Sequence, residues 1–212
     1  MKASKSSAFN DERARALLAK YDCPVPYHEV RTRFLGNIAT PDLAASPLTI
    51  AQGLWGGRFP IFESVAAANE LVAVLINGLW NSLTRHQKRT EPFRLTRLPI
   101  EPTFAGLGAL ALVRQQELDG FVEGLFNGAD DIELPKRASR ALDVLAEARA
   151  LMAGVYALMT DPTIPGSSDE LITTSTNLQG MTPIMEREIH TIVLDCTRAR
   201  RAMLRPSERK LN

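Results

Sequence analysis

The chain has 212 residues, of which 45% are hydrophobic, so it can bury a substantial core in one domain of ordinary size. Its formal net charge of +1 excludes a protein-wide electrostatic field that would attract nucleic acid or an anionic membrane. The longest apolar run, FAGLGALALV at residues 104–113, is far shorter than the ~20 residues that a membrane-spanning helix requires. We therefore expect one domain over residues 1–212 and no membrane partner.

The ends of the chain and its cysteines bear on the cellular compartment. The first residues, MKASKSSAFNDERARALL, lack the apolar stretch of a secretory signal, so we expect no such signal. Cys23 and Cys196 form no CxxC motif, and two isolated cysteines are typical of a reducing environment. These features predict a cytoplasmic protein, and we expect segments 1–8 and 205–212 to be frayed tails.

Apolar residues recur at spacings of three and four over long windows, with no convincing strand alternation, which predicts an all-α protein. The first expected helix runs from Asn10, as its N-cap, to about Tyr21. A short second helix follows Ser46 and Pro47, because serine is a favoured N-cap and proline a favoured first helical residue. It is expected to end within GLWGG.

The third expected helix spans about 64–90, and its apolar residues cover an arc wide enough for burial on more than one side. Prolines follow it closely and predict a helix-free connector over 91–102. The fourth expected helix spans 103–127. We expect 64–90 and 103–127 to be the central helices of a multihelical domain, buried by the others.

Three glycines recur every four residues in the fourth expected helix. Each glycine in a helix interior costs about 1 kcal/mol relative to alanine. We therefore expect Gly120 and Gly124 to let a neighbouring central helix approach closely, and Gly128 to cap the helix C-terminus.

The last part of the chain predicts two further helices. One is expected over about 136–160, after a proline, and a polar stretch up to Gly180 is expected to be a loop or a short helix. The last helix is expected to start at Thr182 with Pro183 as its first residue. No internal repeat is visible.

Two segments carry a resemblance to a known family. Pro60 and Phe62 form a P-x-F element before a long helix that ends with the pair Trp80 and Asn81, and GFVEG at 120–124 matches a GF-x-x-G element. In these motifs and in the order of its elements, the chain resembles the YecA/YgfB family of bacterial proteins. The resemblance implies a multihelical fold with buried central helices, in a family whose members mostly lack an assigned activity.

The chain departs from the family pattern at two points. Glu117 stands where the resemblance would place a tryptophan, three residues before the GF element. The C-terminus RARRAMLRPSERKLN contains no thiol or histidine, so the cysteine-rich zinc tail of some members is absent and no metal function carries over.

A basic segment with interleaved aromatic rings, RHQKRTEPFRLTR at 85–97, is the main candidate interaction patch. Cations and an aromatic ring can hold phosphates and stack a base. The alternative is a solvated helix end whose arginine stems cover apolar surface. The patch residues are Arg85, His86, Lys88, Arg89, Arg94 and Arg97, with Phe93 among them. The tail from Arg198 onward is also basic, and we expect it to be a frayed end.

Clustered acids offer a second possibility of binding. The segment 117–133 contains six carboxylates and no cation; its Asp130, Asp131 and Glu133 are expected in a loop, where carboxylates can bind a hard cation. Elsewhere, Glu186 and His190 are four residues apart and share a helix face, the geometry of two metal ligands, with a surface ion pair as the alternative. Neither segment has an established metal motif, and we predict no cofactor and no metal.

No catalytic motif is present, since G-x-S-x-G is absent and GLWGG lacks the lysine of a phosphate-binding loop. We therefore expect no catalytic residues and a non-enzymatic protein that acts by macromolecular binding, in a regulatory or adaptor role. The expected partner is a protein, including a second copy in a homodimer. One alternative is nucleic-acid binding through 85–97, and another is a metal-dependent enzyme that uses the acidic loop with Glu186 and His190.

Overall fold

The computed structural model describes residues 11–163 and 166–204, and all of the regular structure within them is helical. This confirms the predicted all-α, multihelical class. The elements in chain order are α1 (Asp11–Lys20), α2 (Tyr27–Ala39), α3 (Pro47–Gly53), α4 (Val65–Val72), the π-helix η1 (Ala73–Trp80), α5 (Asn81–Leu83), the 3-10 helix η2 (Thr84–Gln87), α6 (Phe104–Phe126), α7 (Lys136–Thr160) and α8 (Ser168–Leu204). The expected N-cap Asn10 and the tails 1–8 and 205–212 lie outside the described residues.

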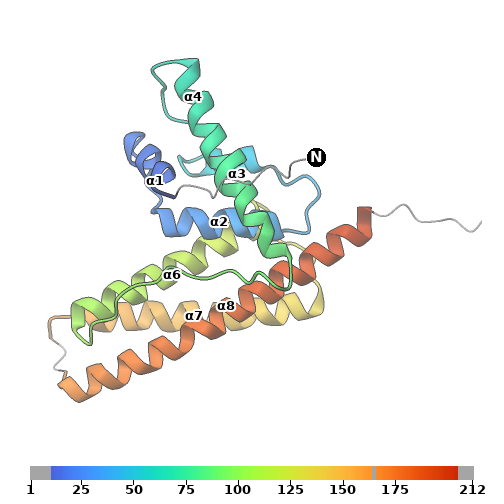
Figure 1. Ribbon diagram of the computed structural model, residues 1–212. Helices are drawn as coiled ribbons and strands as arrows, with labels where there is room; N and C mark the ends of the chain where they lie inside the picture. The colour runs from blue at the N-terminus through green and yellow to red at the C-terminus, as the bar shows by residue number, and fades with distance from the viewer. Residues whose placement is uncertain (1–10, 164–165, 205–212) are drawn as a thin grey trace, which may run out of the picture.

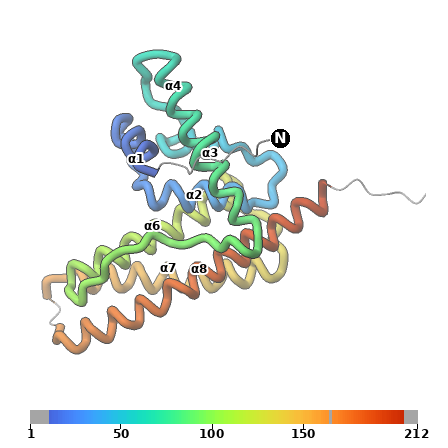
Figure 2. Tube along the Cα trace, viewed as in Figure 1, coloured from blue at the N-terminus to red at the C-terminus, as the bar shows by residue number. Residues whose placement is uncertain are grey.

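The helices form two groups that meet at α2 and α6. Helices α6, α7 and α8 lie along one another, and α2 packs over α6 on the side away from α7 (Figure 1). Elements α4, η1, α5 and η2 follow one another without a break and form one rod, which stands against α2. From the end of this rod the connector 88–103 runs back along the α6 and α8 layer to the start of α6, as Figure 2 shows.

The backbones of α2 and α6 are in direct contact where the two helices cross. A Cβ added to Gly36 of α2 would collide with the carbonyl oxygen of Phe121, and one added to Gly124 of α6 would collide with the carbonyl oxygen of Arg33. At Gly120 an added Cβ would lie 2.7 Å from the carbonyl oxygen of Glu29. The neighbour that requires these glycines is therefore α2.

The centre of the fold differs from the sequence expectation in one helix. Helix α2 was not predicted, yet nine consecutive residues from Thr32 to Thr40 are buried. The expected central helix over 64–90 is instead buried along a single stripe, formed by Leu71, Leu75, Leu79 and Leu83. Thus α6 is central as expected, whereas α2 takes the place that we expected the 64–90 segment to fill.

The start of the last helix was also predicted wrongly. Helix α8 begins at Ser168 and continues through Pro183, so the stretch before Gly180 is helical and Thr182 is not its beginning. Proline in a helix interior removes a hydrogen bond and costs about 3 kcal/mol. Burial of Ser175 and Leu178 in the packed layer offsets part of that cost.

The remaining boundaries follow local capping. The Ser46 side chain accepts a hydrogen bond from the backbone N–H of Leu48 at the start of α3, and Thr103 caps α6 in the same way. The expected helix over 136–160 is confirmed as α7. At the C-terminus of α6 the chain turns through two residues with positive φ, Asn127 at 51° and Gly128 at 82°. Over the described ranges, no helix is long and apolar enough to cross a membrane.

The glycine crossing predicts an unusual response to alanine. Gly124→Ala is expected to lower the free energy of unfolding by about 2 kcal/mol or more, because overpacking against the α2 backbone outweighs alanine's helix propensity. Gly124→Leu should lower the free energy of unfolding further, because its side chain is larger. Urea denaturation measures the change.

The matched control is Gly180→Ala in α8, where an added Cβ has no atom within 4 Å. This substitution should stabilise the protein by up to ~1 kcal/mol. Equal effects of alanine at the two glycines would contradict the close crossing.

Candidate functional site

The structure divides the candidate patch 85–97 into a buried half and an exposed half. His86 is buried, its Nδ1 lies 2.8 Å from the carbonyl oxygen of Glu91, and its ring meets the fully buried ring of Phe93 edge-on at 5.3 Å. Burial lowers the pKa of His86, which favours the neutral imidazole. Because Phe93 is covered, it offers no face on which a base could stack.

Arg94, the next patch residue, ties the connector to α8. Its guanidinium lies 2.5 Å from Oε2 of Glu186, while the other carboxylate oxygen accepts a hydrogen bond of 3.0 Å from the backbone N–H of Leu95. Glu186 is therefore not free to pair with His190 as a metal ligand. Both ring nitrogens of His190 are buried and have no hydrogen-bond partner among the described residues.

A second tie, which was not predicted, holds the connector to α6. Arg114 and Glu117 form a buried ion pair at 2.5 Å, with the Glu117 side chain fully enclosed. Both side chains form hydrogen bonds with the backbone of one connector residue, Thr96. Its N–H donates to Glu117 over 2.7 Å, and its carbonyl accepts from Arg114 over 2.8 Å. We call Arg114, Glu117 and Glu186 the connector clasp. The only sequence signal was the acid at position 117, where the family resemblance would place a tryptophan.

Two of the other acids of 117–133 pair with separate partners. Asp119 forms an exposed ion pair with Arg149 of α7 at 2.8 Å, and Glu123 pairs with Arg33 of α2. Asp130, Asp131 and Glu133 are exposed. Within the part of the chain that the structure describes, no three His, Cys, Asp or Glu side chains are grouped so that they could hold a metal ion.

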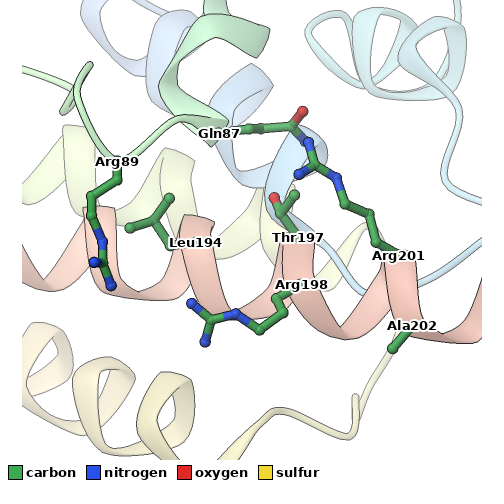
Figure 3. A pocket seen from close by; sticks show the side chains of 7 residues that line it. All are labelled: Gln87, Arg89, Leu194, Thr197, Arg198, Arg201 and Ala202. Carbon is green, nitrogen blue, oxygen red and sulfur yellow. The ribbon is translucent and has the colours of Figure 1, made fainter.

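The exposed part of the patch consists of Arg85, Lys88, Arg89, Arg94 and Arg97. Lys88 pairs with Glu91 at 3.1 Å. Arg89 lines a pocket of about 390 Å³ between the end of the rod and α8 (Figure 3). The pocket is lined by Gln87, Arg89, Leu194, Thr197, Arg198, Arg201 and Ala202.

The basic residues at 198–201 are placed in α8, which is helical to Leu204, and the frayed end expected from Arg198 onward is wrong for these residues. Arg200 is not among the residues that line the pocket, and it donates to the carbonyl of Thr40 over 3.2 Å. Burial, and after it the charge of Arg201, lowers the pKa of Arg200. The structure thus places Arg89 beside the same pocket as Arg198 and Arg201, which lie more than 100 residues later in the sequence.

The outer face of α7 carries several exposed apolar side chains, with the exposed Glu147 among them. Val144, Leu151 and Leu158 are 37%, 47% and 50% exposed, and they recur at intervals of seven residues. Small exposed residues lie beside them, and the stretch ALMAGVYALMT at 150–160 has no charged side chain. We call Val144, Ala150, Leu151, Gly154, Ala157 and Leu158 the α7 face.

No protein-family model, curated protein or solved structure matches this chain. The resemblance to the YecA/YgfB family therefore stays a prediction that rests on the quoted motifs.

The connector clasp predicts a large loss of stability when its buried pair is broken. Glu117→Gln leaves Arg114 buried without a counter-charge, and we expect the free energy of unfolding to fall by about 3–5 kcal/mol. Asp119→Asn, which breaks the exposed pair with Arg149, should cost less than about 1 kcal/mol. Urea denaturation compares the two variants, and similar losses would argue against a buried clasp.

Proposed function

We propose that this chain is a cytoplasmic, non-enzymatic protein that acts by protein binding, and that the α7 face joins two copies in a homodimer. The observation that carries the proposal is that residues 150–160 of a long helix have no charged side chain, although Leu151, Gly154 and Leu158 among them are exposed. Charged residues normally cover the solvent side of a surface helix. An apolar outer face is instead typical of a helix that packs against a partner.

The spacing of the α7 face favours a second helix as the occupant. Seven residues are almost two helical turns, so Val144, Leu151 and Leu158 lie along one line on the helix, as in a coiled-coil seam. In an antiparallel pair related by a two-fold axis, Leu151 would meet its own copy and Val144 would lie opposite Leu158. The same face is then self-complementary.

Small residues and helix length also support this arrangement. Ala150, Gly154 and Ala157 would let the two helix backbones approach closely. The 25 residues of α7 extend over about 37 Å, long enough for an interface with the ~800 Å² per partner that stable complexes bury.

Nucleic-acid binding through 85–97 is weaker as a candidate. Phe93 and His86 are buried, and Arg94 and Lys88 are paired with carboxylates, so the patch offers no base-stacking ring and fewer free cations than its sequence suggests. In a regulatory or adaptor role, the dimer would present the remaining surface of each copy to further proteins.

The dimer proposal is tested with Leu151→Glu. The wild-type chain is expected to show a concentration-dependent dimer in sedimentation equilibrium, and the variant should dimerise at least about tenfold more weakly, because two carboxylates would face each other at the two-fold axis.

The control is Ile61→Glu, which changes a side chain that is 97% exposed in the loop before α4. Its dimer affinity should equal that of the wild type. A wild-type chain that stays monomeric at all concentrations, or a Leu151→Glu dimer as tight as the wild type, would refute the proposal.

A further inference from the structure

We propose that the pocket between the end of the rod and α8 binds the phosphate group of a small phosphate monoester. Arg89, Arg198, Arg201 and Thr197 are among the residues that line it. It lies apart from the α7 face, and the inference goes beyond the proposed dimer.

The cations come from two segments that are distant in sequence. Arg198 and Arg201 are three residues apart on α8 and therefore lie on one helix face, where like charges repel each other. Figure 3 shows the Arg198 side chain extending toward Arg89, and the Arg201 side chain reaching past Thr197 toward Gln87. An anion between these guanidinium groups would turn the repulsion into attraction.

Few acids balance this charge. Asp195 pairs with Arg198 at 3.1 Å and with Arg137 at 3.6 Å, so its one negative charge is shared by two arginines. Over residues 11–163 and 166–204, neither Arg89 nor Arg201 has an ion-pair partner. Within the described part of the chain, about two positive charges at the pocket therefore have no counter-charge, which matches the dianion of a phosphate monoester.

Thr197 is a second, independent observation. Its side chain is 97% buried, and its Oγ1 has no hydrogen-bond partner among the described residues, although it lines the pocket. A threonine in a helix commonly donates to the carbonyl four residues earlier, and a buried hydroxyl without any partner is destabilising. A small movement of the surrounding side chains would let a phosphate oxygen in the pocket accept this hydrogen bond.

The shape of the site favours a small ligand over a polymer. A volume of about 390 Å³ falls within the range of small-molecule sites and leaves room for a group attached to the phosphate. A nucleic acid would need a row of cations along its backbone, one for each singly charged phosphodiester. The arginines here line one pocket.

The test is calorimetric titration of the full chain with inorganic phosphate, against sodium chloride of equal ionic strength. We expect saturable phosphate binding that chloride does not reproduce. Arg201→Gln should weaken it at least about tenfold, as the loss of one charge-assisted hydrogen bond implies. Arg187→Gln is the control, since Arg187 lies on the same helix, pairs with Glu188 at 2.8 Å and does not line the pocket.

A second variant, Thr197→Val, distinguishes a loss of phosphate affinity from a loss of stability. Valine has nearly the same shape, so the melting temperature without phosphate should stay equal or rise, while phosphate affinity falls. Leu151→Glu should bind phosphate as the wild type does, so the result does not depend on dimerisation.

Three results would overturn the site: phosphate heats no larger than those of chloride, wild-type phosphate affinity in Arg201→Gln, or unchanged affinity in Thr197→Val. Tighter binding of a single-stranded oligonucleotide than of phosphate, lost in Arg201→Gln, would also reject the small ligand in favour of nucleic acid.

Discussion

The close crossing of α2 and α6 is the constraint on which the rest of the structure depends. Glycine on both helices lets the backbones touch, and this contact restricts where α2 can lie along α6. From α2, Asn37 accepts a hydrogen bond of 2.9 Å from the Trp80 indole of the rod and donates one of 3.1 Å to Asn127 at the end of α6. One buried amide thus relates the rod to both crossing helices. The rod in turn determines where the connector begins.

Part of this fold could be predicted from the sequence because its signals are local. The α7 boundaries follow a proline start and a strong helical period, and α3 follows a serine cap. Helix α2 could not be predicted from the sequence because it has no amphipathic pattern. Most of its sides are buried, and the buried residues include the polar Arg33 and Asn37. Pro183 predicts a helix start, but tertiary packing keeps α8 continuous through it.

The candidate site was less predictable, because its parts meet only in the folded chain. The basic character of 85–97 was visible, but nothing in it indicated that Phe93 would be buried or that Arg94 would hold Glu186. Arg89 joins Arg201 only because the rod ends beside α8. The sequence also gives no sign that the Thr197 hydroxyl would be buried without a hydrogen-bond partner among the described residues.

The connector clasp has a consequence for motion. The segment around Leu95 and Thr96 has no regular secondary structure, yet its amides donate to carboxylates on two different helices. Breaking those hydrogen bonds would require the connector to separate from both α6 and α8. The free energy of that opening should be close to the free energy of unfolding the whole layer. These two amide protons should therefore exchange with solvent as slowly as those of the helices, so that an irregular stretch belongs to the most rigid part of the protein.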